Sequence, residues 1–477
     1  MNDGNAEIKF GTDGWRAVIA KEFTFGNLER VAQAFADHVI GRGAVQNVSL
    51  VVVGYDRRFL SEFFAERAAQ VIAGNGLRVA LFREAQPTPL ISWSVKEVGA
   101  VGGVMITASH NPFQFNGFKI KAPFGGSAPP ETTAEVEKLL DVNHPSPIDS
   151  FDDGHALLEP AVEKYRAQIE SYIDLARLRE AGAKVIVDPM HGSAGHWVES
   201  FLSGGQTSVE TIRANRDPLF GGVNPEPIDQ NLAALKQRVL ETKGLVGLAT
   251  DGDADRVGAV DELGETMTMH DVVPLMLLHL ARVRKMTGGV VRTFSQSVLL
   301  KRIAKACNLK LYETPIGFKY VADLMLKEDI LLGAEESGGI GVKGHIPERD
   351  GILNSLLFLE TIVAAGKPPS VMLGELHKEF GEFHFGRYDM HLDTNVGLEL
   401  VSELTEKPPS NIAGYNVSGV QTTDGTKLLF DDESWLLFRQ SGTEPVLRIY
   451  AEATSVEKMK TLLSAGEKLA AAKVNPN

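Results

Sequence analysis

The 477 residues include 48 basic and 62 acidic side chains, which gives a formal net charge of −14, and 43% of the residues are hydrophobic. The composition is typical of a soluble globular protein, and the acidic balance argues against a nucleic-acid binder, which needs a basic surface. No apolar run approaches the about 20 residues that cross a bilayer, so we expect no membrane partner. Residues 1–10 lack the apolar core of a secretory signal, and the single cysteine, Cys307, excludes intramolecular disulfides, so we expect a cytoplasmic protein.

Strands and helices are predicted to alternate along most of the chain, and its length suggests about three or four domains. In chain order we expect a helix at 28–40, a strand at 48–53, a helix at 61–74, strands at 77–82, 183–188, 245–249 and 289–294, a helix at 297–307 and a strand at 309–312. This alternation indicates layered α/β domains. From about residue 385 short alternating strands, a turn at 424–425 and a last helix at 455–472 predict a smaller α+β domain.

A serine loop at residues 107–112 (TASHNP) follows the apolar run 101–106, at the predicted end of a strand, where open α/β sheets bind ligands. Pro112 prevents a long helix or sheet from continuing through it. Alone, the segment could be a turn in which side chains bond the backbone. A Ser–His hydrolase is a further interpretation, but Ser109 lacks the G-x-S-x-G elbow, and adjacent Ser109 and His110 point different ways in most loops.

An acidic loop with Asp251, Asp253 and Asp255 lies between the apolar runs 245–249 and 257–260. Three carboxylates this close repel one another unless a cation lies among them, and hard oxygen ligands indicate Mg²⁺ or Ca²⁺. A solvated acidic turn is one alternative. An EF-hand is another, because Asp251, Asp253, Asp255 and Glu262 match its first, third, fifth and twelfth positions, but Arg256 replaces the required glycine and the flanks are predicted strands. Arg256 could instead hold a phosphate beside the metal.

A third loop carries Glu335 and Ser337 after the apolar run 330–334. A carboxylate and a hydroxyl two residues apart can face one ligand and bind sugar hydroxyls, although an ordinary polar loop explains them equally well. The overlapping G-x-G-x-x-G at 339–344 does not open a helix, so we reject dinucleotide binding.

A fourth loop, at residues 439–445 (RQSGTEP), combines an arginine, hydroxyls and glycine. Such groups form a phosphate cradle, although a tight turn between the strands 434–438 and 446–451 is the alternative. No Walker A sequence is present in the chain, so the usual cradle for ATP is missing.

Together and in this order, the four loops resemble those of the α-D-phosphohexomutase superfamily, which includes phosphoglucomutases, phosphomannomutases and phosphoglucosamine mutases. Residues 10–16 (FGTDGWR) and 222–227 (GVNPEP) resemble further signatures, so the resemblance spans nearly the whole chain. It implies an α/β fold of four domains around a central cleft: three with mixed α/β sheets and a smaller C-terminal α+β domain related to the TATA-binding-protein fold. We expect these domains at 1–150, 151–264, 265–383 and 384–477, each contributing one loop.

The resemblance also implies a role for individual residues. Ser109 would carry the phosphoryl group, and an oxygen of Ser109 or its phosphate would hold Mg²⁺ together with Asp251, Asp253 and Asp255. Substrate would be bound by Arg16, Lys319, Glu335, Ser337, Arg439, Ser441, Gly442 and Thr443. Beside the transferring group we expect Arg256 and Lys119, the lysine acting as a base with a lowered pKa. His345, which resembles a histidine of eukaryotic-type phosphoglucomutases, would be a second acid or base, because Gly339 stands where bacterial phosphomannomutase/phosphoglucomutases tend to carry histidine.

The implied reaction moves a phosphoryl group reversibly between the 1- and 6-positions of a hexose phosphate, through phosphoserine and a hexose 1,6-bisphosphate that also acts as activator. The Glu-Glu-Ser form of the third loop favours glucose phosphates. Mannose or glucosamine phosphates, or a glucose 1,6-bisphosphate synthase, remain open, as does a non-catalytic Ca²⁺- or sugar-phosphate-binding protein suggested by the near EF-hand match. The expected partner is a small phosphosugar, bound by a monomer or homodimer.

Overall fold

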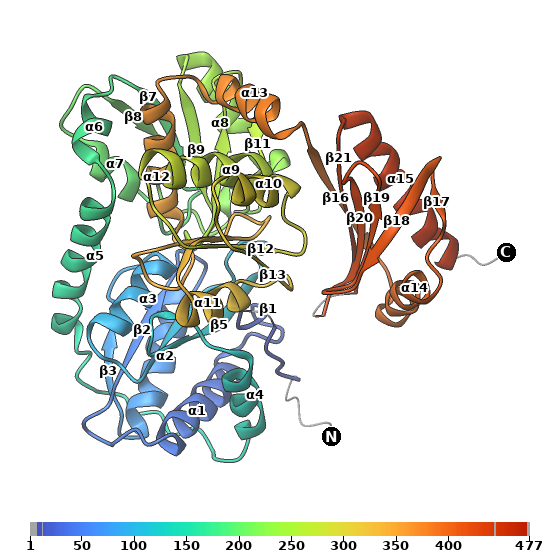
Figure 1. The fold of residues 1–477 in the computed structure, drawn as a ribbon. Helices are drawn as coiled ribbons and strands as arrows, with labels where there is room; N and C mark the ends of the chain where they lie inside the picture. The colour runs from blue at the N-terminus through green and yellow to red at the C-terminus, as the bar shows by residue number, and fades with distance from the viewer. Residues whose placement is uncertain (1–6, 12, 443–444, 475–477) are drawn as a thin grey trace. The chain divides into compact units, whose positions relative to one another are not determined.

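The computed structural model describes residues 7–11, 13–442 and 445–474, and its strands form four sheets along the chain (Figure 1). The chain forms two compact units. The first comprises the residues up to 267 together with 322–327 and 337–369, and the second comprises 268–321, 328–336 and the residues from 370 onward. The third segment of the first unit therefore returns to it after an intervening part of the second.

The first sheet has the order β1-β5-β4-β2-β3, with β6 paired to β5. Its elements are β1 (Trp15–Val18), α1 (Phe25–Gly41), β2 (Leu50–Tyr55), α2 (Ser61–Gly74), β3 (Arg78–Leu81), α3 (Thr88–Glu97), β4 (Gly102–Ile106), β5 (Phe115–Ala122), β6 (Gly126–Ser127) and α4 (Pro130–Leu139). Strands β2, β3 and β4 are parallel, whereas β5 runs antiparallel to β4 and β1. Every residue of β2 is buried, as its unbroken apolar run predicts.

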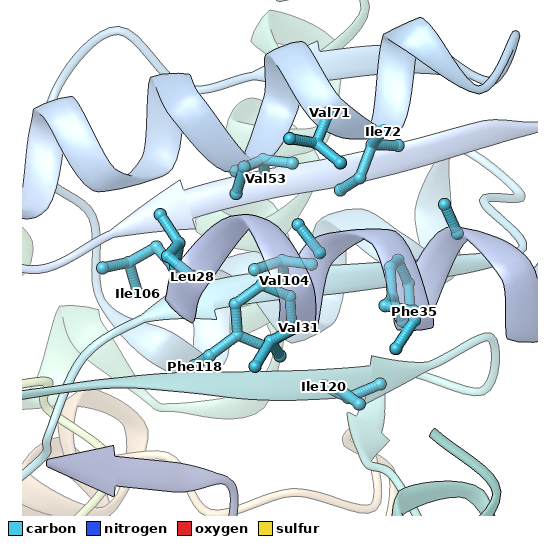
Figure 2. Packing of buried hydrophobic residues seen from close by; sticks show 14 of the residues in the cluster. Leu28, Val31, Phe35, Val53, Val71, Ile72, Val104, Ile106, Phe118 and Ile120 are labelled. Carbon is cyan, nitrogen blue, oxygen red and sulfur yellow. The ribbon is translucent and has the colours of Figure 1, made fainter. Parts of the chain in front are cut away.

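Helices α1 and α2, which contact each other, pack against this sheet to form its core (Figure 2). Leu28, Val31 and Phe35 of α1 face the side chains of β4 and β5, and Val71 and Ile72 of α2 lie over β2. The ring of Phe35 meets that of Phe118 edge to face at 6.3 Å between centroids. This packing fixes β4 and β5, the two strands that flank the serine loop.

The second sheet has the order β11-β10-β9-β7-β8. Its elements are α5 (Glu159–Tyr172), α6 (Leu175–Glu180), β7 (Lys184–Asp188), α7 (Trp197–Leu202), β8 (Ser208–Thr211), α8 (Ala233–Thr242), β9 (Val246–Thr250), β10 (Val257–Val260) and β11 (Thr266–Met267), with short 3₁₀ turns at His155–Leu157, Phe220–Gly222 and Asp229–Asn231. Strand β15 (Ile340–Val342) and helix α12 (Gly351–Ala365) also belong to the first unit, and α12 packs against β9 and β10. A helix from late in the chain thus supports the second sheet.

In the second unit, strand β12 (Gly289–Thr293) lies between β13 (Leu311–Thr314) and β14 (Ile330–Ala334), and all three are parallel. The accompanying helices are α9 (Met269–Leu278), which continues into a π-helical turn at His279–Val283, α10 (Val298–Ala306) and α13 (Pro369–Phe380). Helix α11 (Phe318–Lys327) begins in this unit, and its residues 322–327 belong to the first.

The C-terminal sheet is antiparallel, with the order β16-β21-β20-β19-β18-β17. Its elements are β16 (His384–His391), α14 (Thr394–Glu406), β17 (Asn411–Ile412), β18 (Tyr415–Gln421), β19 (Thr426–Phe430), β20 (Trp435–Gln440), β21 (Val446–Ala453) and α15 (Val456–Val474). Helices α14 and α15 pack against its strands, and together they form the core of this domain. Three mixed α/β domains followed by a smaller antiparallel-sheet domain confirm the predicted fold class.

Within the described ranges no single helix is long and apolar enough to cross a membrane; α12 and α13 meet the criterion only as a bent pair. Residues 351–362 of α12 are all buried, which suits a core helix.

Replacing Phe35 by Ala should lower the free energy of unfolding of the first unit by about 3–5 kcal/mol, because the ring leaves a cavity between α1 and the sheet. Urea denaturation followed by tryptophan fluorescence would measure this change. Val48→Ala is the matched control, since Val48 is 65% exposed. A loss below about 1 kcal/mol for Phe35→Ala would contradict the packing described for this core.

Candidate active site

Ser109 lies in the loop between β4 and β5, at the carboxyl end of β4, as predicted. Its backbone φ of 52° is in the left-handed region, which is uncommon for a residue other than glycine. The side chain is buried, and its Oγ donates a hydrogen bond to Oδ2 of Asp251 at 2.8 Å. His110 Nδ1 is farther away, at 3.4 Å from the same Oγ. The loop therefore directs the serine hydroxyl at the acidic loop rather than at a histidine base.

The acidic loop joins β9 to β10, which are antiparallel neighbours. Asp251, Asp253 and Asp255 are fully buried, and one carboxylate oxygen from each lies within 4.8 Å of the others. An EF-hand loop joins two helices, so the flanking strands exclude that interpretation. Burial also excludes a solvated acidic turn.

The carboxylate oxygens in this loop fit a divalent cation. Asp251 Oδ1 accepts hydrogen bonds from the backbone N–H groups of Asp255 and Arg256, at 3.0 and 3.1 Å. In contrast, the Oδ1 atoms of Asp253 and Asp255 are buried and accept no hydrogen bond from the described residues. Buried carboxylate oxygens without a partner are costly, and a hard cation such as Mg²⁺ would satisfy them.

The charges in the loop act differently on each aspartate. Burial, together with the neighbouring carboxylates of Asp253 and Asp255, raises the pKa of Asp251 well above its ordinary value. Burial also acts to raise the pKa of Asp253, but Lys119 outweighs it and holds that pKa below its ordinary value. A cation binding here would thus displace a proton held by Asp251.

Lys119 lies on β5 with its amine buried among three carboxylates. Its Nζ is 2.9 Å from Asp13 Oδ2, 2.8 Å from Asp253 Oδ2 and 3.1 Å from Asp255 Oδ2. Burial lowers the pKa of Lys119, but the three carboxylates raise it by more, so it lies above its ordinary value. The expected lowered pKa is therefore wrong, and Lys119 is a cation that offsets the acidic loop.

Arg16 and Arg256 lie at the same site. The Arg16 guanidinium donates to Asn111 Oδ1 at 2.7 Å, so β1 contacts the serine loop directly. Arg256 Nε is 4.0 Å from Asp251 Oδ2 and 3.8 Å from Asp255 Oδ1, both beyond hydrogen-bond distance. These loose ion pairs leave its guanidinium available to an anion.

Several charged residues in this cluster were not among the predicted site residues. Arg349 contacts Asp255 at 2.8 Å and also pairs with Asp13, whereas Glu348 accepts a hydrogen bond from Lys121 at 2.8 Å. Sequence signals could have indicated two other members of this cluster, Asp13 and Lys121. Asp13 lies inside the quoted 10–16 segment, and Lys121 shares one face of β5 with Lys119 because alternate strand residues point the same way.

His345 has a different environment from the one expected of an acid or base. Its side chain is only 1% exposed and stacks on Trp93, with ring centroids 5.7 Å apart. Its Nε2 lies 3.0 Å from Asp350 Oδ2, which also accepts a hydrogen bond from Tyr165. Asp350 in turn caps the N-terminus of α12. These contacts assign His345 to an aromatic cluster that supports α12, and we do not retain it as an acid or base.

In the second unit, Arg439 is the penultimate residue of β20 and donates from Nε to Asp424 Oδ2 at 2.9 Å. Asp424 also accepts a hydrogen bond from the backbone N–H of Ile316 at 2.8 Å. Arg448 is directly opposite Arg439 on β21, so both side chains emerge on one face of the sheet. Asp424 and Arg448 were not predicted; the register of β20 and β21, which sequence periodicity leaves open, brings the two arginines together.

The remaining predicted residues occupy several elements. Glu335 follows β14 and is buried, and the neighbouring Glu336 accepts a hydrogen bond from Ser295 at 2.6 Å. Ser337 is half-buried in the first unit. Lys319 lies in the first turn of α11. Of the fourth loop, Ser441 is buried and its N–H donates to Val446 O, Gly442 is exposed, and Thr443 falls outside the described residues.

Four family profiles match successive parts of the chain. They are described as phosphoglucomutase/phosphomannomutase alpha/beta/alpha domain I at residues 7–145, domain II at 163–264, domain III at 270–380, and the C-terminal domain at 400–465. Each of the four loops falls within or directly beside one matched segment.

Several known proteins are similar to this chain over nearly its whole length. A phosphoglucomutase/phosphomannomutase of Thermococcus kodakarensis is 32% identical over 461 residues, which cover 96% of this chain and 98% of that protein. A phosphoglucosamine mutase of Erythrobacter litoralis is 31% identical over 465 residues, with 95% of each chain covered. A solved structure of a putative phosphomannomutase from Thermus thermophilus has a TM-score of 0.86 at 37% identity and covers 98% of this chain and 100% of its own. A more distant structure, an Aspergillus fumigatus N-acetylphosphoglucosamine mutase in complex with GlcNAc-6P and magnesium, shares the fold at 15% identity and a TM-score of 0.59, covering 98% and 95%.

Mg²⁺ should bind more tightly, and raise the melting temperature further, as the pH rises through the raised pKa of Asp251. The raised pKa of Asp251 means that its protonated form stabilises the metal-free fold at low pH. This contribution is lost as the pH rises through that pKa, and the cation then replaces the proton. Isothermal titration calorimetry in buffers of different ionisation enthalpy would count the protons released.

Asp253→Asn should abolish this Mg²⁺ response. Glu262→Gln is the informative control, because Glu262 would be a ligand in an EF-hand but lies outside the aspartate cluster. Equal loss of binding in both variants, or a pH-independent affinity, would contradict the site described here.

Proposed function

Because this chain belongs to the α-D-phosphohexomutase superfamily and is a phosphohexomutase, an isomerase, we propose that it interconverts glucose 1-phosphate and glucose 6-phosphate through a phosphoserine at Ser109. The observation that supports this assignment most directly is the 2.8 Å hydrogen bond from Ser109 Oγ to Asp251, within the buried aspartate cluster. Membership of an enzyme family overturns the alternative of a non-catalytic Ca²⁺- or sugar-phosphate-binding protein.

The proposed Mg²⁺ ligands are Asp251, Asp253, Asp255 and an oxygen of Ser109 or its phosphate. When bound, the ion would withdraw charge from the phosphoryl oxygens and ease departure of the serine oxygen. Lys119 and Arg256 supply fixed positive charge beside the same atoms. The raised pKa of Lys119 suits this electrostatic role and not that of a base.

A further set of residues is proposed to bind the substrate. Arg439, Ser441 and Thr443 would bind the phosphate that is not transferred, with Arg448 on the same face of the sheet. Gly442 frees the loop backbone for the same contact, and Glu335, Ser337, Arg16 and Lys319 would bind the sugar or its phosphate.

In the first transfer, the free 6-hydroxyl oxygen bonds to phosphorus as the bond from phosphorus to Ser109 Oγ breaks, and the proton of the hydroxyl passes to the departing Ser109 Oγ. The product is a hexose 1,6-bisphosphate, which turns end for end in the site. In the second transfer, Ser109 Oγ bonds to the phosphorus at the 1-position as the bond from that phosphorus to the sugar oxygen breaks, and the serine proton passes to that oxygen, which frees hexose 6-phosphate. Added hexose 1,6-bisphosphate would act as activator by phosphorylating any Ser109 that has lost its phosphate.

The choice of glucose rests on the Glu335-Glu336-Ser337 form of the third loop. Relatives of this chain are named phosphoglucomutase/phosphomannomutase and phosphoglucosamine mutase, so mannose and glucosamine phosphates are the rival substrates. A coupled assay with all three 1-phosphates, with and without glucose 1,6-bisphosphate, would rank them. Release of bisphosphate faster than of hexose 6-phosphate would favour the bisphosphate-synthase alternative.

Ser109→Ala should lower kcat by about 10³-fold or more, because the group that accepts and returns the phosphoryl is removed. The coupled assay and intact-mass measurement of serine phosphorylation would test this together. Ser94→Ala, at another buried serine, controls for loss of a hydroxyl from the fold. Near-normal turnover by Ser109→Ala would eliminate the phosphoserine route.

Arg439→Ala should raise KM for the hexose phosphate by about 10- to 100-fold with little change in kcat, because a charge-assisted hydrogen bond to phosphate is lost. Arg282→Ala is the control, since Arg282 pairs with Glu379 on the surface of the same unit. An unchanged KM would remove Arg439 from the phosphate site.

A further inference from the structure

Arg58, which was not among the predicted site residues, binds the serine loop through backbone carbonyl groups. Arg58 follows β2, and its side chain is fully buried. Its guanidinium donates hydrogen bonds to four backbone carbonyl oxygens: three in the loop between β4 and β5, those of Ser109 at 2.7 Å, Asn111 at 2.7 Å and Pro112 at 2.9 Å, and that of Phe115, the first residue of β5, at 3.1 Å. The planar fork of an arginine can span several acceptors at once, which the single ammonium of lysine cannot.

A second series of hydrogen bonds holds the backbone N–H of Ser109. The N–H of Ser109 donates to Thr107 Oγ1 at 2.9 Å, and that hydroxyl donates to Asp56 Oδ2 at 2.6 Å. Asp56 Oδ2 in turn lies 3.2 Å from Arg58 Nε. The carbonyl and the amide of Ser109 are thus both tied, through different atoms, to one buried ion pair.

This arrangement maintains a backbone conformation that serine would not adopt unaided. At a φ of 52°, Ser109 is in the left-handed region, where a side chain other than glycine's is strained. The same conformation is the one in which Ser109 Oγ meets Asp251 at 2.8 Å. If the loop relaxed, the hydroxyl would move relative to the aspartate cluster.

Supporting the loop with the buried ion pair of Asp56 and Arg58 is unfavourable in free energy. Burying both charges costs free energy that their attraction and hydrogen bonds only partly return, and an apolar pair of similar size would often be more stable. Arg58 is also close enough to the aspartate cluster for Asp253 and Asp251 to act on its charge. A buried charge retained beside reacting groups suggests a task in positioning them.

We propose that Arg58 is a positioning residue for phosphoryl transfer: through the carbonyls of the serine loop and of the first residue of β5 it keeps Ser109 Oγ at the aspartate cluster in both transfer steps. This inference rests on the proposed function of Ser109 as the phosphoryl carrier. Because the side chain of Arg58 is fully buried and its guanidinium is engaged with backbone carbonyls, Arg58 would act through the loop and not on substrate or phosphate directly. Its removal should therefore affect the rate of transfer and leave substrate binding in the second unit intact.

The first test is Arg58→Ala, assayed with glucose 1-phosphate and Mg²⁺. A displacement of the nucleophile by about 1 Å can cost about 100-fold in rate, so kcat should fall by about 100-fold while KM stays within about threefold. Added guanidinium ion at sub-denaturing concentration should restore part of the lost kcat by occupying the vacated space, whereas ammonium should not. Arg58→Lys should remain close to Arg58→Ala, because one ammonium cannot reach all four carbonyls.

Arg57→Ala is the matched control. Arg57 is the adjacent arginine, and it donates to the carbonyl of Ala214 instead of to the serine loop. This variant should keep near-wild-type kcat and KM. A kcat for folded Arg58→Ala close to that of Arg57→Ala would overturn the proposal, as would a loss that guanidinium leaves unchanged.

If Arg58→Ala does not fold, a pair of less disruptive variants at Thr107 tests the proposal. Thr107→Val removes the hydroxyl that joins Asp56 to the Ser109 amide but keeps the side-chain shape, and Thr107→Ser keeps the hydroxyl. Loss of a hydrogen bond of about 1–1.5 kcal/mol corresponds to about a tenfold lower kcat for Thr107→Val at unchanged KM, with Thr107→Ser near wild type. Equal kcat values for the pair would overturn the proposal.

Wild type and Ser109→Ala in the same assay separate the two hypotheses. If wild type shows no turnover and no serine phosphorylation, or if Ser109→Ala stays active, the proposed function fails and this inference fails with it. If wild type is active and Ser109→Ala is not, the Arg58 and Thr107 variants test the positioning role alone.

Discussion

Mutual repulsion among Asp251, Asp253 and Asp255 is the constraint on which the rest of the first unit depends. With the three carboxylates confined to one buried turn, the fold must bring positive charge to them or leave them protonated. It does so from far apart in the chain: Lys119 comes from β5 and Arg349 from the segment before α12. The first sheet, the second sheet and a late helix are therefore held to one geometry by electrostatics as well as by their apolar cores.

The chemistry follows from how these charges are distributed. Asp253 and Asp255, which both pair with Lys119, each keep one oxygen that accepts no hydrogen bond from the described residues, and Asp251 accepts the serine hydroxyl. The cluster is thus balanced enough to fold and still suited to a cation and a phosphoryl group. In the second unit, Asp424 orients Arg439, for which we propose a role in binding the sugar phosphate, and ties the turn before β19 to the loop before α11.

Much of the fold could be predicted, because local patterning specifies it: the helix expected at 61–74 is α2, and the turn expected at 424–425 joins β18 to β19. The serine and acidic loops were recognisable since unusual residues stand where strands end. What sequence could not give were quantities set by distant neighbours. The pKa of Lys119 depends on three carboxylates, all of them more than a hundred residues away in the sequence, and they raise it where a lowered pKa was expected from the sequence. The role of Arg349, and the packing of α12 on the second sheet, likewise depend on contacts that periodicity does not encode.

The return of residues 337–369 to the first unit has a consequence for how the protein is made. The backbone N–H of Gly351 donates to Ala254 O, and that of Val257 donates to Gly338 O, so the hairpin with the aspartates is braced by chain synthesised about a hundred residues later. When the ribosome has completed the first two sheets, the hairpin still lacks Arg349 and the whole of α12. Until the third sheet has emerged from the ribosome, the three carboxylates lack these contacts and are either exposed to water or protonated. The surroundings of the three aspartates can therefore be completed only late in translation. A nascent chain that stalls before residue 337 contains Ser109 and the three aspartates but lacks Arg349 and α12.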